Sequence, residues 1–384
     1  MTKLKVLQVI PKLGYGGAET GCYDIAHFLA ENNCASFIAT SGGQLLKFVK
    51  KSRVKIYRLP VHSKNPLLIF LNTLFLIAII IFKQINIVHA RSRAPAWSCY
   101  FASLITRRKF VTTFHGTYTF SNAYKKFYNS IMLKTKLTIA GSNFIFDHIN
   151  KNYEKYLNHK NKLRVIFRGI NLEYFDERNI SALKQQKLKT EWKISSNKFI
   201  ILMPGRLTQW KGQEQLIDAL NILNEDYNNS NFQAIILGSD QGRKVYKKKL
   251  LDLVQRYSLN QKVQFIQHCR EMPIAYSLAN VVVSASIRPE AFGRVAIESQ
   301  AMGKVIIASD IGGSKETIIK NKSGFLYKHN DPRELAKILN TVMELDQDKI
   351  NSIGSEGRKN VSQKFDVETM CESTLREYKK LIKN

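Results

Sequence analysis

The sequence predicts an α/β protein with two Rossmann-like domains in series, each built on a parallel sheet. Short apolar runs rich in β-branched residues recur along the 384-residue chain, and helix-length segments separate most of them. These runs lack the in/out alternation of strands that have one wet face, so both of their faces are expected to be buried under helices. The length also favours two domains, since one domain usually spans about 100–200 residues.

Seven strands are predicted in the first half of the chain and six in the second. Most of them precede a helix-length segment, which is the order that produces parallel sheets. The first seven runs are 4–10, 37–40, 55–59, 85–90, 110–115, 137–140 and 163–167. The other six are 198–203, 232–237, 263–267, 281–285, 305–309 and 325–327. The stretch 172–197, rich in Lys, Asn, Gln and Ser, is predicted to be the linker, and an amphipathic helix is predicted over 367–381.

The charge is strongly basic and unevenly distributed. Lys and Arg number 59 against 30 Asp and Glu, and residues 1–180 hold 27 of the basic side chains but only 8 of the acidic ones. No acidic residue occurs from Asn32 to Phe146, where 17 Lys and Arg lie. A field of this sign attracts anionic lipid headgroups, phosphorylated glycans or nucleic acid. A general Lys-rich composition bias is the alternative, but it does not explain why acids vanish from the first half alone.

Cysteine usage indicates a reducing compartment. The five cysteines are odd in number and scattered, with no CxxC pair, which argues against a disulfide framework and against a structural zinc site. No signal peptide is visible, because the chain passes from Met1 almost directly into an apolar run with no small-residue cleavage site after it.

The segment 67–82 is almost wholly apolar, interrupted by Asn72 and Thr73. It falls short of the roughly 20 residues that a bilayer-spanning helix needs, and it lies between two predicted strands of one sheet. We therefore favour a helix that lies between the first sheet and a membrane surface. A fully buried core helix and a true membrane span are the two other interpretations.

Two motifs follow predicted strands in the first half. The Gly-Tyr-Gly-Gly-Ala-Glu run at 14–19 opens a helix, where glycines permit close backbone approach and N–H groups favour an anion. It lacks the GxGxxG spacing and the later acid of a dinucleotide site, and a merely tight turn fits it equally well. The Thr-Phe-His-Gly run at 113–116 ends a strand at the edge of the sheet where ligands bind. His115 can donate to a sugar hydroxyl or a phosphate there, or make a structural hydrogen bond to backbone.

A third motif follows the first strand of the second half. Arg206 and Lys211 lie five residues apart in one loop. Together they can grip one diphosphate, the Arg through planar multi-point hydrogen bonds and the Lys as a point charge. In so basic a chain, solvated surface charge is the alternative.

The fourth motif is the most specific. Glu290 and Glu298 lie eight residues apart, on either side of Phe292-Gly293, directly after the buried run 281–285. The N–H groups around 292–294 would point from the start of a helix towards a phosphate. Glu298, predicted two turns into that helix, could accept both hydroxyls of a ribose, and Glu290 could accept sugar hydroxyls.

With these motifs the chain resembles the family 4 retaining glycosyltransferases, which have the GT-B fold of two Rossmann-like domains facing each other across a cleft. The resemblance covers nearly the whole chain, since all four motifs and Gly312-Gly313 with Glu316 occur in the family's order. It departs from the family's pattern at Arg168, where an Asn is usual. It implies an acceptor-binding domain over 1–175, a nucleotide-sugar-binding domain over 195–365, and a crossover helix over 366–384 that packs back on the first domain.

The resemblance also implies roles for individual residues. His115 would lie near the anomeric centre, and the leaving phosphate would help to deprotonate the acceptor, so that no enzyme nucleophile is required. Arg206 and Lys211 would bind the diphosphate. The implied catalytic residues are His115, Glu290, Arg206 and Lys211; the donor-binding residues are Arg206, Lys211, Glu290, Phe292, Gly293, Arg294 and Glu298; the acceptor-side residues are Gly16 and Gly17.

The expected activity is transfer of a hexose from GDP-mannose or a UDP-hexose to a lipid-linked acceptor, for which lipopolysaccharide core is the first choice. The expected location is cytoplasmic, on the inner face of the plasma membrane, with an anionic membrane surface as partner and no nucleic acid. No cofactor or metal is expected, because the DxD at 346–348 lies in a charged helical stretch. A UDP-sugar epimerase of the same fold and a basic nucleic-acid-binding protein are the alternatives; the first would need more acid–base groups, and the second a recognisable nucleic-acid-binding motif.

Overall fold

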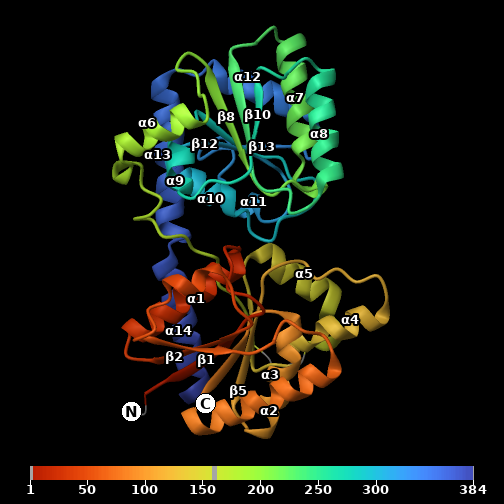
Figure 1. The fold of residues 1–384 in the computed structure, drawn as a ribbon, viewed down its shortest axis with the longest axis vertical. Coiled ribbons are helices and arrows are strands. Elements are labelled where there is room, and N and C mark those ends of the chain that lie inside the picture. The colour runs from red at the N-terminus through yellow and green to blue at the C-terminus, as the bar shows by residue number, and fades with distance from the viewer. Residues whose placement is uncertain (1–2, 158–161, 384) are drawn as a thin grey trace. The chain divides into compact units, whose positions relative to one another are not determined.

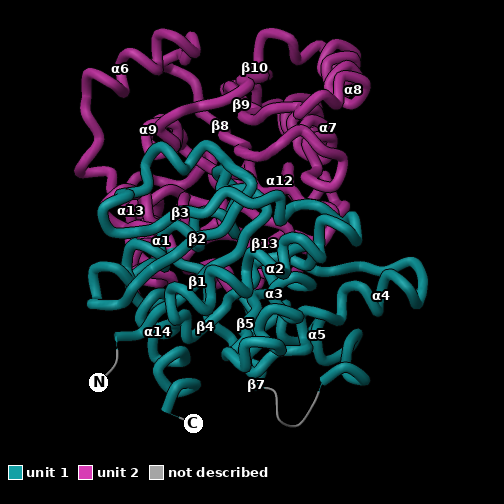
Figure 2. Tube along the Cα trace, turned by 60° about the horizontal axis from the view of Figure 1, so that its bottom comes forward, with its two compact units in different colours: residues 1–169, 367–384 teal, residues 170–366 magenta. Residues whose placement is uncertain are grey.

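The computed structural model describes residues 3–157 and 162–383, and the chain divides into two compact units (Figures 1 and 2). Unit 1 comprises residues 1–169 with 367–384, and unit 2 comprises residues 170–366. Each unit contains one sheet in which all paired strands are parallel, so the predicted α/β class is confirmed. Within the described residues, all thirteen predicted strands are present, each within two residues of its predicted ends.

The sheet of unit 1 has the strand order β3-β2-β1-β4-β5-β6-β7. The chain therefore runs outward from β1 in one direction and from β4 in the other. Because parallel crossovers are right-handed, the two directions place their helices on opposite faces of the sheet. The strands are β1 (Lys5–Val9), β2 (Ala35–Thr40), β3 (Val54–Arg58), β4 (Ile87–Ala90), β5 (Lys109–Phe114), β6 (Leu137–Ala140) and β7 (Lys162–Val165).

Helices α1 (Gly17–Glu31) and α14 (Val367–Lys383) pack together on one face of this sheet. Helices α2 (Pro66–Lys83) and α3 (Arg93–Ile105) pack together on the other, and α4 (Ala123–Ser130) and α5 (Asn143–Tyr153) follow (Figure 1). The helix predicted over 367–381 is α14. Its buried Tyr378 hydroxyl hydrogen-bonds Nδ1 of His89 on β4, so the last helix completes the core of unit 1.

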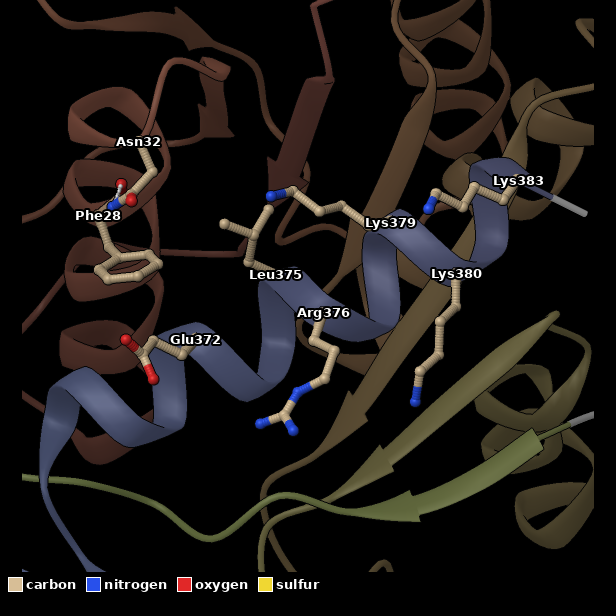
Figure 3. Close-up of a pocket in the computed structure, with 8 residues that line it drawn as sticks. All are labelled: Phe28, Asn32, Glu372, Leu375, Arg376, Lys379, Lys380 and Lys383. Atoms are coloured by element: carbon tan, nitrogen blue, oxygen red, sulfur yellow. Dashed lines mark hydrogen bonds between the residues drawn. The ribbon is translucent and has the colours of Figure 1, made fainter. Parts of the chain in front are cut away.

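A basic pocket lies between α1 and α14 (Figure 3). Phe28 and Asn32 line it from the C-terminal end of α1, and Arg376, Lys379 and Lys380 line it from α14. Gly16 and Gly17 lie at the other end of α1. The pocket is therefore separate from the predicted acceptor-side glycines.

The sheet of unit 2 has the strand order β10-β9-β8-β11-β12-β13. Its strands are β8 (Phe199–Pro204), β9 (Phe232–Leu237), β10 (Val263–Ile266), β11 (Val281–Ser284), β12 (Val305–Ser309) and β13 (Phe325–Tyr327). The largest core cluster buries aliphatic side chains of these strands against α7 (Gln213–Glu225) and α12 (Pro332–Met343). The remaining helices are α6 (Ala182–Glu191), α8 (Lys244–Arg256), α9 (Met272–Ser277), α10 (Arg294–Ala301), α11 (Ser314–Thr317) and α13 (Gln347–Lys364).

The stretch 172–197 differs from a plain linker, because it contains α6 and belongs to unit 2. Ser181 caps this helix by accepting a hydrogen bond from the Lys184 N–H. Gln185 donates from Nε2 to the Ser277 hydroxyl of α9 at 3.0 Å, and Trp192 just after the helix is buried. The Lys- and Gln-rich composition that suggested a linker is the exposed side of a surface helix.

Helix α2 coincides with the apolar segment 67–82, and by length and composition alone it could cross a membrane. Asn72 and Thr73 lie on its buried side, whereas Phe70 and Phe75 are more than half exposed. The interpretation as a fully buried core helix is therefore wrong. One side of α2 packs on the unit and the other carries apolar side chains outward.

Candidate active site

Three loops of unit 2 carry most of the predicted donor-binding residues. They follow β8, β11 and β12, which are neighbours in a parallel sheet. Because the carboxyl ends of parallel strands share one edge of the sheet, the loops converge there. The first holds Arg206 and Lys211, the second holds Glu290, and the third holds Gly312 and Gly313.

Lys211 and Glu290 form a buried ion pair at this edge. Lys211 Nζ donates to Glu290 Oε1 at 2.7 Å, and the two side chains are only 14% and 11% exposed. The Ser286 hydroxyl also donates to Oε1. Burial alone would raise the pKa of Glu290, but the charge of Lys211 and the hydrogen bonds from Lys211 and the serines outweigh it and lower that pKa. Glu290 is therefore an ionised, oriented carboxylate.

Close backbone approach positions this pair. Gly212, directly after Lys211, has φ +75°, and a Cβ there would lie 1.8 Å from the Ala285 carbonyl oxygen. The Ile287 N–H donates to the Trp210 carbonyl at 2.9 Å, which ties the loop after β8 to the loop after β11. A residue with a side chain at Gly212 would force these loops apart, and Lys211 would move away from Glu290.

The Gly312-Gly313 pair supports the Glu290 loop from the other side. The Gly313 N–H donates to the Glu290 carbonyl at 2.9 Å. A Cβ at Gly313 would lie 2.4 Å from the Phe292 Cα, and one at Gly312 would lie 2.6 Å from the Glu290 carbonyl oxygen. Only glycine permits this approach, so the two glycines fix the backbone of the loop on which Glu290 stands.

Helix α10 begins immediately after Gly293, whose φ of +85° makes it the left-handed N-cap. Glu298 is the fifth residue of this helix, so it lies about one turn from the helix start; the predicted two turns are wrong. Its carboxylate is buried, and each oxygen accepts one hydrogen bond: Arg294 Nε donates to Oε1 at 2.6 Å, and the Tyr276 hydroxyl donates to Oε2 at 2.8 Å.

Arg206 differs from the other residues of this group. Its side chain is exposed, and its backbone carbonyl accepts a hydrogen bond from Gln213 Nε2. The structure thus brings Lys211 into contact with Glu290, and Arg294 into contact with Glu298. Among the described residues, the Arg206 side chain makes no contact with Lys211 or Glu290. Phe292 is buried, and its ring packs edgewise on that of Phe365 with the ring centroids 5.4 Å apart. Its ring therefore belongs to the core, and only its backbone can take part in the site.

His115 lies in unit 1, directly after β5. Arg168 Nη1 lies 3.4 Å from its Nδ1. Burial, and then the charges of Arg168 and Arg91, lower the pKa of His115 well below its usual range. The imidazole is therefore neutral, and with Arg168 donating to Nδ1 its proton is on Nε2. Within the described part of the chain this buried Nε2 has no hydrogen-bond partner.

Gly16 and Gly17 lie where α1 starts, with Gly16 as the N-cap. The nearest atoms to a Cβ at Gly16 would be those of the flexible Glu19 carboxylate, and a Cβ at Gly17 would meet nothing within 4 Å. Arg168 connects this region with His115, because its guanidinium lies where a Cβ of Gly21 in α1 would stand. The space at the start of α1 is thus open, and a basic group lies one turn further along the helix.

Sequence reasoning missed Tyr276, Ser286 and Arg91. Tyr276 and Ser286 bond the two glutamates, and Arg91 is buried at the end of β4, where its guanidinium donates to Gln8 Oε1 at 2.6 and 2.9 Å. Tyr276 lies on a six-residue helix with no motif of its own. Ser286 could have been found, because it follows the strand run 281–285 by one residue, at the edge where the ligand-binding loops start.

Tyr276→Phe is expected to reduce stability without changing the fold. Burial, and then the charge of Glu298, raise the pKa of Tyr276 well above its usual range, so its hydroxyl stays a donor. Removing a hydrogen bond to a charged group costs about 1.5–3 kcal/mol, measurable by urea unfolding. The matched control is Tyr327→Phe, because Tyr327 is equally buried and its hydroxyl accepts a hydrogen bond from the neutral Ser309 hydroxyl. Equal losses for the two variants would show that the bond to Glu298 has no special weight.

Among the described residues, metal-ligand side chains do not cluster at the carboxyl ends of β8, β11 and β12. Within residues 3–157 and 162–383, no group of three or more His, Cys, Asp or Glu side chains could hold a metal ion. Of the DxD at 346–348, Asp346 caps α13 by accepting a hydrogen bond from the Lys349 N–H. Asp346 therefore has a local structural role at a helix start.

Comparisons with known proteins agree with this geometry. Residues 15–174 match the family described as Glycosyltransferase Family 4, and residues 184–360 match the family described as Glycosyl transferases group 1. A crystal structure of a glycosyltransferase from Rickettsia africae ESF-5 is 37% identical, with a TM-score of 0.91 and full coverage of both chains. Anabaena Alr3699/HepE in complex with UDP and glucose has a TM-score of 0.82 at 24% identity, over 98% of this chain and 100% of that one, and shows the shared fold.

Among curated proteins, the D-inositol 3-phosphate glycosyltransferase of Corynebacterium urealyticum is 29% identical over 200 residues, which is 51% of this chain and 46% of that protein. The chain spans about half the length of the curated relatives it matches. The full-length structural match and the two family matches together settle the family. The chain belongs to the GT-B glycosyltransferases, with a family 4 region in its first half and a group 1 region in its second.

Proposed function

We propose that this glycosyltransferase moves a hexose from a nucleotide sugar, GDP-mannose or a UDP-hexose, to a lipid-linked acceptor with retention of configuration and without a metal. The acceptor that fits best is lipopolysaccharide core, at the cytoplasmic face of the plasma membrane. Unit 2 binds the donor and unit 1 binds the acceptor. The complexes of Alr3699/HepE with UDP support a nucleotide-sugar donor.

The buried Lys211–Glu290 ion pair carries this proposal. A fixed ammonium beside an ionised carboxylate suits a substrate with a diphosphate next to a sugar, because the ammonium attracts phosphate oxygens while the carboxylate accepts sugar hydroxyls. Arg206, exposed in the same loop, is free to turn towards the diphosphate on binding. At the start of α10, the N–H groups around Phe292, Gly293 and Arg294 add a second anion-binding element.

In the proposed mechanism, Glu298 accepts the ribose hydroxyls. Both of its oxygens already accept hydrogen bonds from the protein, but each carboxylate oxygen has a further lone pair. In unit 1, neutral His115 offers its Nε2–H to a hydroxyl near the anomeric centre, and Gly16 and Gly17 leave room for the acceptor. The leaving diphosphate takes the acceptor proton, and Lys211 offsets the charge that it gains.

The two alternatives are less well supported. The family assignment is to transferases, and it does not favour an epimerase. Nucleic-acid binding leaves the converging loops of unit 2 without a role. A gel shift with DNA, compared with vesicle flotation, separates nucleic acid from lipid as the target of the basic charge.

The proposal predicts nucleotide release from one donor in a panel of UDP-, GDP- and ADP-sugars, with EDTA present and bacterial lipid extract as acceptor. Release despite EDTA, with the anomeric configuration of the product read by NMR, tests metal independence and retention together. Because diphosphate charge is offset by Lys211 rather than by an ion, the rate should be unchanged by the chelator. Loss of turnover in EDTA, restored by Mg²⁺ or Mn²⁺, contradicts the metal-independent mechanism.

A further inference from the structure

The amphipathic pattern of α2 is inverted. On an ordinary surface helix the polar residues face water and the apolar ones face the core. On α2 the two polar residues face inward: Asn72 Nδ2 donates to the Pro60 carbonyl at 3.2 Å, and the Thr73 hydroxyl donates to the Ile69 carbonyl at 2.8 Å. Both side chains are buried. The outward side carries apolar residues, and the helix ends at the exposed Lys83.

These outward residues form one continuous stripe. The first five are spaced i, i+3, i+4, i+7 and i+8, and the last two at i+14 and i+15 return to the same side of the helix. Each is between 38% and 81% exposed. They are Leu67, Phe70, Leu71, Leu74, Phe75, Ile81 and Phe82.

Helix α3 extends the stripe. It packs against α2, and the Ser98 hydroxyl donates to the Ile69 carbonyl at 3.1 Å. Its outward residues Phe101, Leu104 and Ile105 are 40%, 62% and 63% exposed. We call the stripe of α2 and these three residues together the α2–α3 face. A contiguous apolar surface of this kind on a soluble unit marks an interaction site.

The charge around the α2–α3 face indicates its partner. Exposed basic residues stand at the ends of the two helices: Lys64 before α2, Lys83 at its last turn, and Arg107 and Arg108 directly after α3. No acidic residue occurs anywhere from Asn32 to Phe146. An apolar face with cations at the ends of its two helices fits a surface that offers hydrocarbon below a layer of anions, as a bilayer with anionic lipids does.

A second copy of the chain fits this surface less well. Pairing two α2–α3 faces would bring two sets of lysines and arginines together, and the segment 32–146 that carries both helices holds no acidic residue to neutralise them. Like charges across an interface are unfavourable. Full insertion of α2 across a bilayer also fits less well, because α2 connects β3 and β4 of the same sheet and buries Asn72 and Thr73 in the unit.

We propose that the α2–α3 face docks this protein on an anionic lipid bilayer, with α2 lying in the interface plane. The apolar stripe enters the acyl boundary while the flanking cations remain at the headgroups. The inference gives a structural basis for the membrane location in the proposed function. Its test needs no turnover and can fail or succeed independently of the donor and acceptor.

The test is flotation of the full chain with vesicles of phosphatidylcholine, with and without phosphatidylglycerol. Wild type is expected to float with the anionic vesicles and much less with the neutral ones. Phe70→Ser/Phe75→Ser should lower the partition coefficient roughly tenfold or more, because two exposed phenyl groups no longer enter the bilayer. Leu183→Ser/Val245→Ser is the matched control, since it removes two exposed apolar side chains from unit 2, and should float like wild type.

Charge-reversal variants in the same assay distinguish binding through the α2–α3 face from the general attraction of a basic protein to anionic lipid. Lys83→Glu/Arg108→Glu should abolish the preference for phosphatidylglycerol, whereas Lys244→Glu/Lys248→Glu, the same charge change at exposed positions of α8, should leave most of it. Equal losses in both pairs, flotation of the Phe variant like wild type, or no flotation of wild type overturns the proposal. So does a dimer in light scattering that the Phe variant converts to monomer, which would assign the face to a second copy.

Failure of the proposed function gives a different result. The Phe70→Ser/Phe75→Ser variant should bind the donor nucleotide with wild-type affinity by calorimetry, because both residues lie in unit 1 and the donor loops lie in unit 2. A protein that floats through this face yet binds no nucleotide sugar would contradict the donor assignment alone. One that binds the donor but does not float would contradict the docking surface alone.

Discussion

Replacing Lys211 with Met is expected to lower turnover by roughly a hundredfold to a thousandfold, the usual effect of removing one group that stabilises charge in a transition state. Lys211 is held within 2.7 Å of Glu290 by the backbone contact of Gly212 with Ala285. It therefore needs no reorganisation to meet the charge that develops on the leaving diphosphate. The measurement is single-turnover transfer with saturating donor, which separates the chemical step from donor binding.

The same substitution is expected to destabilise unit 2. Removing one partner of a buried ion pair leaves the other charge uncompensated, at a cost of about 3–5 kcal/mol. Lys211→Met/Glu290→Gln serves as the control, because it removes both charges and should recover most of the stability but none of the turnover. Urea unfolding measures the stability, and the transfer assay measures the turnover. Wild-type turnover in the single variant would mean that Lys211 is merely a structural partner of Glu290.

Glu298→Ala is expected to cripple transfer while the fold is retained. Under the proposed function its carboxylate accepts the ribose hydroxyls, and loss of such charge-assisted hydrogen bonds costs about 1.5–3 kcal/mol, or roughly tenfold to a hundredfold in donor affinity. Arg294, which loses this ion pair, is 38% exposed, so water can solvate it, and circular dichroism should remain that of wild type.

Calorimetric titration with the donor nucleotide gives the affinity for this prediction. Glu225→Ala is the control, because Glu225 is an exposed carboxylate of α7 in the same unit. The Glu225→Ala variant should bind the donor nucleotide with wild-type affinity. Wild-type donor affinity and turnover in Glu298→Ala would remove Glu298 from the binding site and leave it as an internal partner of Tyr276 and Arg294.

The strands were predictable because parallel strands buried on both faces appear as short apolar runs whatever the rest of the fold does. The run 281–285 and strand β11 differ by one residue. Glu290 was also accessible from sequence, since the loop after a central strand is where polar side chains reach a ligand. Its ionised state was not, because it depends on Lys211 and Ser286, which fold against it from a different loop and from the end of the strand.

The direction of α2 could not be predicted. Its composition is so apolar that no side of the helix stands out, and the sequence does not show which way Asn72 and Thr73 face. They turn inward because Asn72 finds the Pro60 carbonyl and Thr73 the carbonyl one turn before it. Likewise, Tyr276 contacts Glu298 across 22 residues, and no local pattern announces a pairing at that separation. Tertiary contacts decided both features.

The route of the chain through its two units has a consequence for biosynthesis. Residues 367–384 complete unit 1, yet the ribosome makes them only after the whole of unit 2. Until α14 has been synthesised, the sheet of unit 1 lacks the cover of Met370, Leu375 and Tyr378, and Nδ1 of His89 lacks the Tyr378 hydroxyl. Unit 2 is continuous in sequence and can fold first. Unit 1 therefore keeps an apolar surface uncovered, and accessible to chaperones, until residues 367–384 have been synthesised.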